Sequence, residues 1–179
     1  MSSIYELTSR RQSDRGYDAS RAVEPEKITR ILECARLAPS ACNSQPWHFV
    51  VVNDPALCQE VAKSLNSMGM NKFAFEAPCH ILIVQESPNF TARLGGWVKN
   101  KHFPLIDCGI VASYLTLAAT EEGLGSCVLG WFDEGKIKKI LGIPKSKRVL
   151  LDITLGYSTQ NHRDKVRKEL EEISSFNKY

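Results

Sequence analysis

The sequence predicts a single α+β domain, on three observations. At 179 residues the chain is long enough for one domain that buries roughly 70% of the surface exposed by its unfolded form. Segments with helical spacing of apolar residues are interspersed with short apolar runs typical of strands. No repeat, low-complexity tract or linker divides the chain, and the elements are too mixed for a regular series of parallel strand and helix units.

The elements follow from apolar spacing and from Ser, Asp, Pro or Gly at their ends. Helices are predicted over residues 3–13, 24–38, 54–65, 103–122 and 133–141. Strands are predicted over residues 47–52, 81–84, 127–129 and 149–155. Loops are expected at 66–71 and 86–102, and the charged stretch from 157 to 179 is expected to form a tail or arm.

Composition excludes several classes of protein. The net charge of +3 is too small for a chain that neutralises a nucleic-acid backbone. No apolar run approaches the roughly 20 residues that span a bilayer, and no signal peptide is recognisable. The six cysteines are scattered, without metal-ligand spacing, and are expected to be mostly reduced fillers. We expect a cytoplasmic protein that binds no metal, nucleic acid or membrane.

Two segments carry polar groups suited to ligand binding. Arg10, Arg11, Ser13 and Arg15 would converge at a helix end, where guanidinium groups can grip phosphate oxygens; the alternative is a solvated charged turn. The loop from Pro39 to Trp47 places amide and hydroxyl groups before a strand, which suits the edge of a heterocycle, although structural turns use the same residues.

The remaining candidates are weaker. Asp107 lies inside the apolar helix 103–122 and is expected to accept a structural hydrogen bond. That helix is expected to be central, covered in part by a partner chain. Three histidines beside apolar segments are expected to be packed rather than catalytic: His48, His80 and His102. Cys42 alone among the thiols lies in a polar loop and could be exposed.

Taken together, these segments resemble the nitroreductase family in order and spacing over almost the whole chain. The resemblance rests on Arg-x-Ser-x-Arg at 11–15, APSACNSQPWHF at 38–49, AP at 77–78, DCG at 107–109, EEGLGSCVLGWF at 121–132 and LGY at 155–157. It implies an α/β sandwich with a mostly antiparallel central sheet flanked by helices. It also implies an intertwined homodimer with FMN at the interface, in which the arm from about 157 to 179 packs on the partner chain.

The resemblance also implies which residues hold FMN. Arg11, Ser13 and Arg15 would hold the phosphate and ribityl chain, and Arg163 or a basic neighbour would close over the phosphate. Other FMN contacts are expected, from the partner chain, at Pro39, Ser40 and Asn43 and, near the flavin ring, at Asn71, Leu129 and Gly130. No side chain of the protein is expected to be catalytic, because the cofactor carries the chemistry.

The implied activity is a ping-pong hydride transfer from NADH or NADPH, through N5 of FMN, to a nitroaromatic, quinone or related acceptor. Alternatives are another reductive or flavin-modifying reaction on the same fold, or a flavin-binding redox sensor without turnover that uses Cys42. The sequence departs from the family pattern at Arg10 and in the unpatterned stretch 86–102. The chain is also shorter than larger members, so we expect a more exposed flavin.

Overall fold

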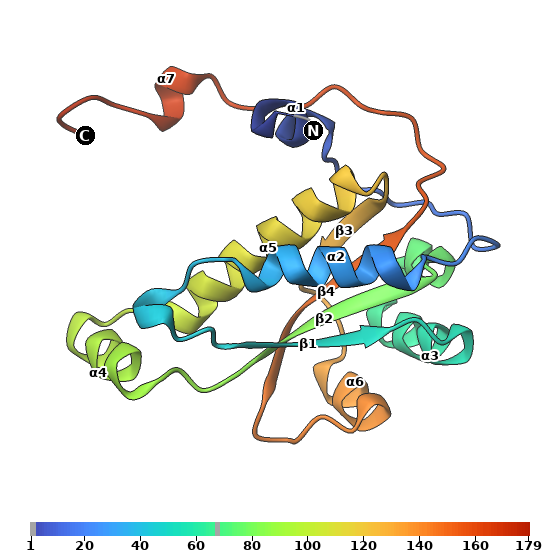
Figure 1. Cartoon of the computed structure of the whole chain (residues 1–179), viewed down its shortest axis with the longest axis horizontal. Coiled ribbons are helices and arrows are strands. Elements are labelled where there is room, and N and C mark those ends of the chain that lie inside the picture. Colours follow the sequence, from blue (N-terminus) through green and yellow to red (C-terminus); the bar gives the residue numbers. More distant parts are fainter. Residues whose placement is uncertain (1–2, 67–68) are drawn as a thin grey trace.

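The computed structural model describes residues 3–66 and 69–179. Its centre is a four-stranded antiparallel sheet in the order β1, β2, β4, β3 (Figure 1). The strands are β1 Trp47–Val52, β2 Cys79–Gln85, β3 Gly125–Leu129 and β4 Arg148–Gly156. The predicted mixture of helices with a mostly antiparallel sheet is confirmed.

Helices cover both faces of the sheet, so the chain forms three layers (Figure 1). One face carries α2 Pro25–Arg36 and α5 Phe103–Glu121, and the other carries α3 Pro55–Leu65 and α6 Glu134–Leu141. A short 3-10 helix, Lys72–Glu76, packs beside α3. The short helix α1 Ile4–Arg10 lies against α5 and has no buried residue.

The alternation of side chains along β2 divides the core in two. Ile81 and Ile83 are fully buried on the α2 and α5 side, whereas Leu82 and Val84 are buried on the α3 and α6 side. Successive residues of a strand point to opposite faces, so this strand must be apolar at nearly every position.

Helix α5 is the longest element, and by length and hydropathy alone it could cross a membrane. Core helices of folded domains pass the same test. Here α5 packs on α2 and on the sheet, and it buries the polar residues Asp107, Thr116 and Thr120 within the domain. The contacts are those of a central core helix.

One expectation about the secondary structure was wrong. The stretch 86–102 contains a helix, α4 Phe90–Lys99, capped by the side chain of Asn89 and ended by Asn100 in the left-handed conformation. Gly95 and Gly96 lower its helix propensity by about 1 kcal/mol each, which hides it in the sequence, but contacts with α5 and with the loop at 41–43 stabilise it. Ser67 and Met68 of the loop predicted at 66–71 lie outside the described residues.

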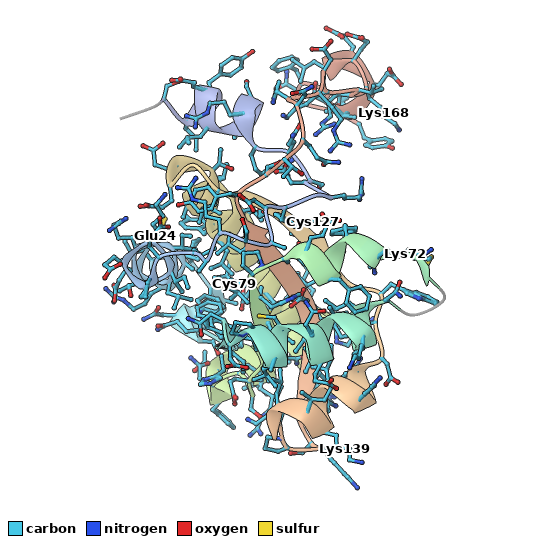
Figure 2. All side chains as sticks on the ribbon, turned by 90° about the vertical axis from the view of Figure 1, so that its right-hand side faces the viewer. Glu24, Lys72, Cys79, Cys127, Lys139 and Lys168 are labelled. Carbon is cyan, nitrogen blue, oxygen red and sulfur yellow. The ribbon has the colours of Figure 1, made fainter. Side chains whose placement is uncertain are left out.

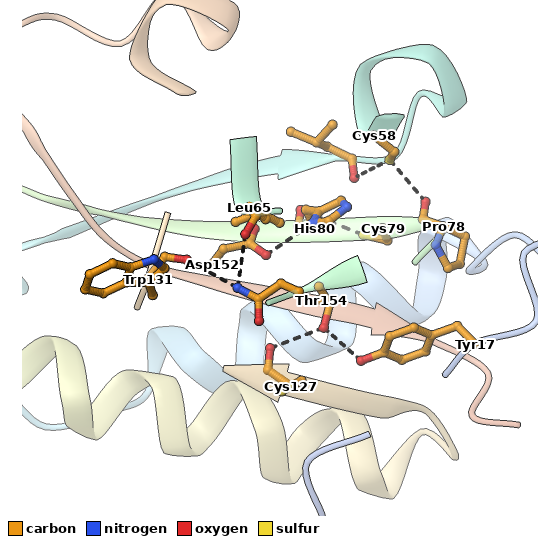
Figure 3. Close-up of polar contacts among 12 residues, drawn as sticks. Tyr17, Cys58, Leu65, Pro78, Cys79, His80, Cys127, Trp131, Asp152 and Thr154 are labelled. Atoms are coloured by element: carbon orange, nitrogen blue, oxygen red, sulfur yellow. Dashed lines mark hydrogen bonds and ion pairs between the residues drawn. The ribbon is translucent and has the colours of Figure 1, made fainter. Parts of the chain in front are cut away.

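The burial of the histidines and cysteines differs in part from what the sequence predicts. His80 is fully buried and contacts the carboxylate of Asp152, Nδ1 to Oδ2, at 3.1 Å (Figure 3). His48 and His102 are exposed, so they are not packed as expected. Four thiols are buried, but Cys34 as well as Cys42 is exposed.

The C-terminal tail first pairs with an N-terminal segment and then leaves the domain. Residues 158–165 run beside residues 9–16, for example through Thr159 N–H to the Gly16 carbonyl at 3.2 Å. Beyond this the tail extends past α1, away from the sheet, and ends in the single turn α7 Leu170–Ile173 (Figures 1 and 2). Its apolar side chains are largely exposed: Val166, Leu170, Ile173 and Phe176.

The two-sided core predicts a large difference between buried and exposed aliphatic residues. We expect Ile153→Ala, at a position that is 1% exposed, to lower the free energy of unfolding by about 2–5 kcal/mol. We expect Val98→Ala, at a position that is 61% exposed, to change it by less than about 0.5 kcal/mol. Urea unfolding followed by circular dichroism measures both, and equal effects would contradict this description of the core.

Candidate functional site

Basic side chains from both ends of the chain meet beside the segment 9–13. The Arg163 guanidinium donates to the Ser13 carbonyl at 2.6 Å, and the Arg163 N–H donates to Oε1 of Gln12 at 3.0 Å. The Lys165 ammonium donates to the Ser9 carbonyl. Burial lowers the pKa of Lys165, and the positive charges of Arg11 and Arg167 lower it further. Several cations therefore share one small region, which is the electrostatic requirement of an anion site.

Ser13 and Arg15 connect this cationic region to the sheet. Ser13 forms a parallel bridge with Ser126 on β3, and its hydroxyl makes a hydrogen bond with the Cys127 thiol. Burial raises the pKa of that thiol, while the nearby charge of Arg15 acts in the opposite direction. Arg10 differs from these residues, because its guanidinium donates to the Thr120 carbonyl at 3.3 Å and so ties α1 to the end of α5.

A groove of about 480 Å³ opens next to Arg11 on the outer side of α5. Apart from Leu117, the α5 residues that line it are small or short: Gly109, Ala112, Ser113 and Thr116. Val128 of β3 and Leu151 of β4 complete it on the sheet side. Small side chains let a flat ring approach a helix closely, so the groove combines an apolar floor with a positive end.

The predicted residues Asn71, Leu129 and Gly130 lie together at the far end of β3. The Asn71 amide donates to the carbonyl of Leu65 at 3.0 Å and to that of Trp131 at 3.3 Å. Figure 3 shows Leu65 and Trp131 at this junction, near Asp152. Asn71 thus fixes the backbone that follows Leu129 and Gly130, and its amide hydrogens are already committed within the protein.

The loop at 40–45 has an unusual backbone. Cys42, Asn43 and Gln45 all have positive φ, at 51°, 49° and 46°. Non-glycine residues in this region cost on the order of 1 kcal/mol or more each and persist only when surrounding contacts impose them. The strain marks this loop as a specified structure.

Hydrogen bonds from two helices impose this conformation. The buried carboxylate of Asp107 on α5 accepts the Ala41 N–H at 3.1 Å. Asn89, the cap of α4, donates its side-chain amide to the Cys42 carbonyl at 2.9 Å and its backbone N–H to the Ser44 hydroxyl at 2.8 Å. Asp107 is therefore a structural acceptor, as the sequence suggested, and Asn89 is a loop-positioning residue that the sequence analysis missed.

Within one chain, this loop and the groove cannot contact one ligand. Asp107 binds the loop, whereas Gly109 lines the groove. Side chains two positions apart in an α-helix point in directions about 200° apart around its axis, so these two residues face nearly opposite sides. The structure therefore brings Arg11, Ser13, Arg15 and Arg163 together and places Asn71 beside Leu129 and Gly130, at the end of β3. It holds Pro39, Ser40 and Asn43 on the opposite side of α5.

No group of three or more His, Cys, Asp or Glu side chains among residues 3–66 and 69–179 is arranged to hold a metal ion. Burial raises the pKa of Cys108 to about 11, and the neighbouring Asp107 charge adds to the effect. Such a thiol is a poor nucleophile at neutral pH.

Comparison with known proteins identifies the family of this chain. The sequence model of the nitroreductase family matches residues 8–69 and 65–157. A protein of Archaeoglobus fulgidus, provisionally named an NADH dehydrogenase/NAD(P)H nitroreductase, is 32% identical over 82% of this chain and 80% of its own. The oxygen-insensitive NADPH nitroreductase of Helicobacter pylori strain J99 is 28% identical over 91% of each chain.

The fold has solved counterparts as well. The structure of an FMN-dependent nitroreductase from Clostridium difficile R20291 superimposes with a TM-score of 0.79 at 27% identity, over 98% of this chain and all of that one. The fold of this chain is thus similar to that of a solved FMN-dependent nitroreductase. This chain belongs to the nitroreductase family.

The role of Asn89 predicts a local effect on dynamics. We expect Asn89→Ala to accelerate amide hydrogen exchange at residues 41–45 and in the first turn of α4. Each of these segments loses one hydrogen bond with the Asn89 side chain. The matched control is Asp54→Ala, which removes the cap of α3 but no loop contact. Unchanged exchange at 41–45 in Asn89→Ala would show that the loop is held by other contacts.

Proposed function

We propose that this chain is an NAD(P)H-dependent flavin oxidoreductase that uses FMN to reduce a nitroaromatic, quinone or related acceptor by a ping-pong cycle. The observation that carries the proposal is the groove on α5, apolar along its floor and cationic at one end, in a chain of the nitroreductase family. When bound, FMN accepts a hydride from NADH or NADPH and passes it on.

The residues present fit this cofactor. Arg11, Arg163 and Lys165 supply the positive charge for a phosphate, with Arg15 close by on the sheet side. The small residues of α5 leave room for a planar ring. The backbone at Leu129 and Gly130, fixed by Asn71, would direct its amides at the ring and stabilise negative charge there.

The proposed site needs a second copy of the chain. Pro39, Ser40 and Asn43 face away from the groove of their own chain, so they reach a flavin only in a partner. The apolar tail residues and a groove of about 500 Å³ between α1, α2 and α5 are surfaces that a homodimer would cover. We propose that residues 157–179 pack on the partner chain, and that the dimer is cytoplasmic.

One alternative of a different kind remains to be tested, namely a redox sensor without turnover. Exposed Cys42, held at positive φ in the loop, is the feature that favours it. Rapid oxidation of NADH or NADPH by the purified protein with a quinone acceptor would exclude the sensor. Product analysis with several acceptors separates nitro and quinone reduction from other reductive or flavin-modifying reactions on this fold.

The first prediction concerns the cofactor itself. The protein purified from cells should show the visible spectrum of an oxidised flavin, and heat denaturation should release free FMN into the supernatant. Because the phosphate is the anchor, riboflavin should bind much more weakly than FMN to the apoprotein. A colourless preparation that also fails to bind added FMN would falsify the proposed function.

The second prediction concerns Arg11. We expect Arg11→Ala to weaken FMN binding by about ten- to a hundredfold, as expected for the loss of a charge-assisted hydrogen bond, while the oligomeric state stays unchanged. The control is Arg36→Ala on α2, whose guanidinium contacts only Glu33 among the contacts described. Fluorescence titration with FMN and light scattering measure the two quantities. An unchanged FMN affinity would remove Arg11 from the site.

A further inference from the structure

A second groove, of about 670 Å³, lies between α4 and the start of α5. One face of α4 forms its wall through Ala92, Arg93, Gly96, Trp97 and Asn100, at the spacing of successive helical turns. The sequence analysis took this stretch for a loop, so neither α4 nor the groove was foreseen. Nothing in the proposed FMN contacts uses these residues.

The groove is basic. Arg93, Lys101, His102 and Arg148 line it, and none of the described residues on its wall is acidic. Two carboxylates next to lining residues are already paired: Glu86, which follows Gln85, binds Lys147, and Glu134 binds Arg148. The charges of Arg93 and Lys101 are therefore not neutralised by a carboxylate in the described contacts.

The same groove offers aromatic and apolar contact area. Trp97 is 82% exposed, and Leu105 is about half exposed at the start of α5. An exposed indole provides a flat stacking surface for an aromatic ring. Asn100 and Gln85 add amide groups at the edge. A ligand that satisfies all these groups has an aromatic ring and an anionic substituent.

The groove is mechanically joined to the loop proposed to contact flavin. Asn89 caps α4 and at the same time holds the backbone of Cys42 and Ser44. A ligand on α4 is therefore linked through Asn89 to the loop that carries Ser40 and Asn43. This link favours an acceptor of the flavin over an unrelated ligand.

We propose that the α4 groove binds the carboxylate of an aromatic acceptor, so that the enzyme prefers anionic over neutral nitroaromatic acceptors. The proposal rests on the proposed function. In the reaction, a hydride from NAD(P)H, transferred through FMN, and a proton from solvent convert the nitro group to a nitroso group and water. The groove contributes binding of the ring and its anionic substituent, and takes no part in the electron transfer.

The test compares para-nitrobenzoate with its neutral methyl ester on the FMN-loaded protein. In Arg93→Gln/Lys101→Gln, the ratio of kcat/KM for the acid to kcat/KM for the ester should fall about fivefold relative to the wild type. Comparing ratios between variants removes the difference in intrinsic reactivity of the two probes. Calorimetric titration with para-nitrobenzoate should show the same loss of affinity without turnover.

The control variant is Lys139→Gln/Lys145→Gln, which removes the same charge from exposed positions on and after α6. Its ratio should stay at the wild-type value. An unchanged ratio in Arg93→Gln/Lys101→Gln, or an equal fall in the control, would overturn the proposal. A rise in KM for NADPH but not NADH, with the acceptor ratio unchanged, would also overturn it, because the groove would then bind the donor's phosphate.

Turnover of a neutral quinone separates this inference from the proposed function. Quinone reduction should be normal in the wild type and in both double variants. If the wild type binds no FMN and reduces no quinone, the proposed function has failed and the inference falls with it. If quinone reduction is normal but the ratio does not move, only the inference is wrong.

Discussion

The packing of α5 is the constraint on which the rest of the structure depends. One side of this helix is buried against the sheet and α2, and the other borders a groove with β3 and β4. The buried side holds the loop at 40–45 through Asp107, while the open side faces Arg11. A single helix thus separates the two groups of residues that the proposed site requires, which is why we propose that a second copy of the chain completes that site.

The tail crosses residues 12–16 and thereby places basic side chains on the open side of α5. Gly125 is essential to this crossing, because a Cβ there would lie 2.8 Å from Cβ of Ser158 and 2.9 Å from the Asp14 carboxylate. Asp14 is buried and accepts from Gln12 and Ser158, so its charge is used within the crossing. The tail thereby carries Arg163 to the Ser13 carbonyl and Lys165 to the Ser9 carbonyl, close to Arg11.

The sequence predicted those parts of the fold that depend on local pattern. The bounds of β1 agree exactly, since β-branched residues and the flanking turns define it, and α2, α3, α5 and α6 agree to within one or two residues. Helix α4 was missed because its stability comes from contacts with distant residues. Likewise, the resemblance predicts a flavin contact at Asn43, but the left-handed backbone of Asn43 could not be predicted, since Asp107 and Asn89 impose it from far along the chain.

The thiols and the histidine buried in the core are not available to select the acceptor. Burial raises the pKa of the thiols of Cys58 and Cys108 to about 11, and His80 is fully enclosed with Asp152, so neither kind of group meets a ligand. With the redox chemistry supplied by FMN, discrimination falls to shape and charge around the ring. Among the described segments beside the loop at 40–45, which is proposed to contact flavin, only α4 with the start of α5 presents both an exposed indole and cations that lack a paired carboxylate. We therefore expect substitutions in this segment to change which acceptors are reduced, while the contacts with FMN stay the same.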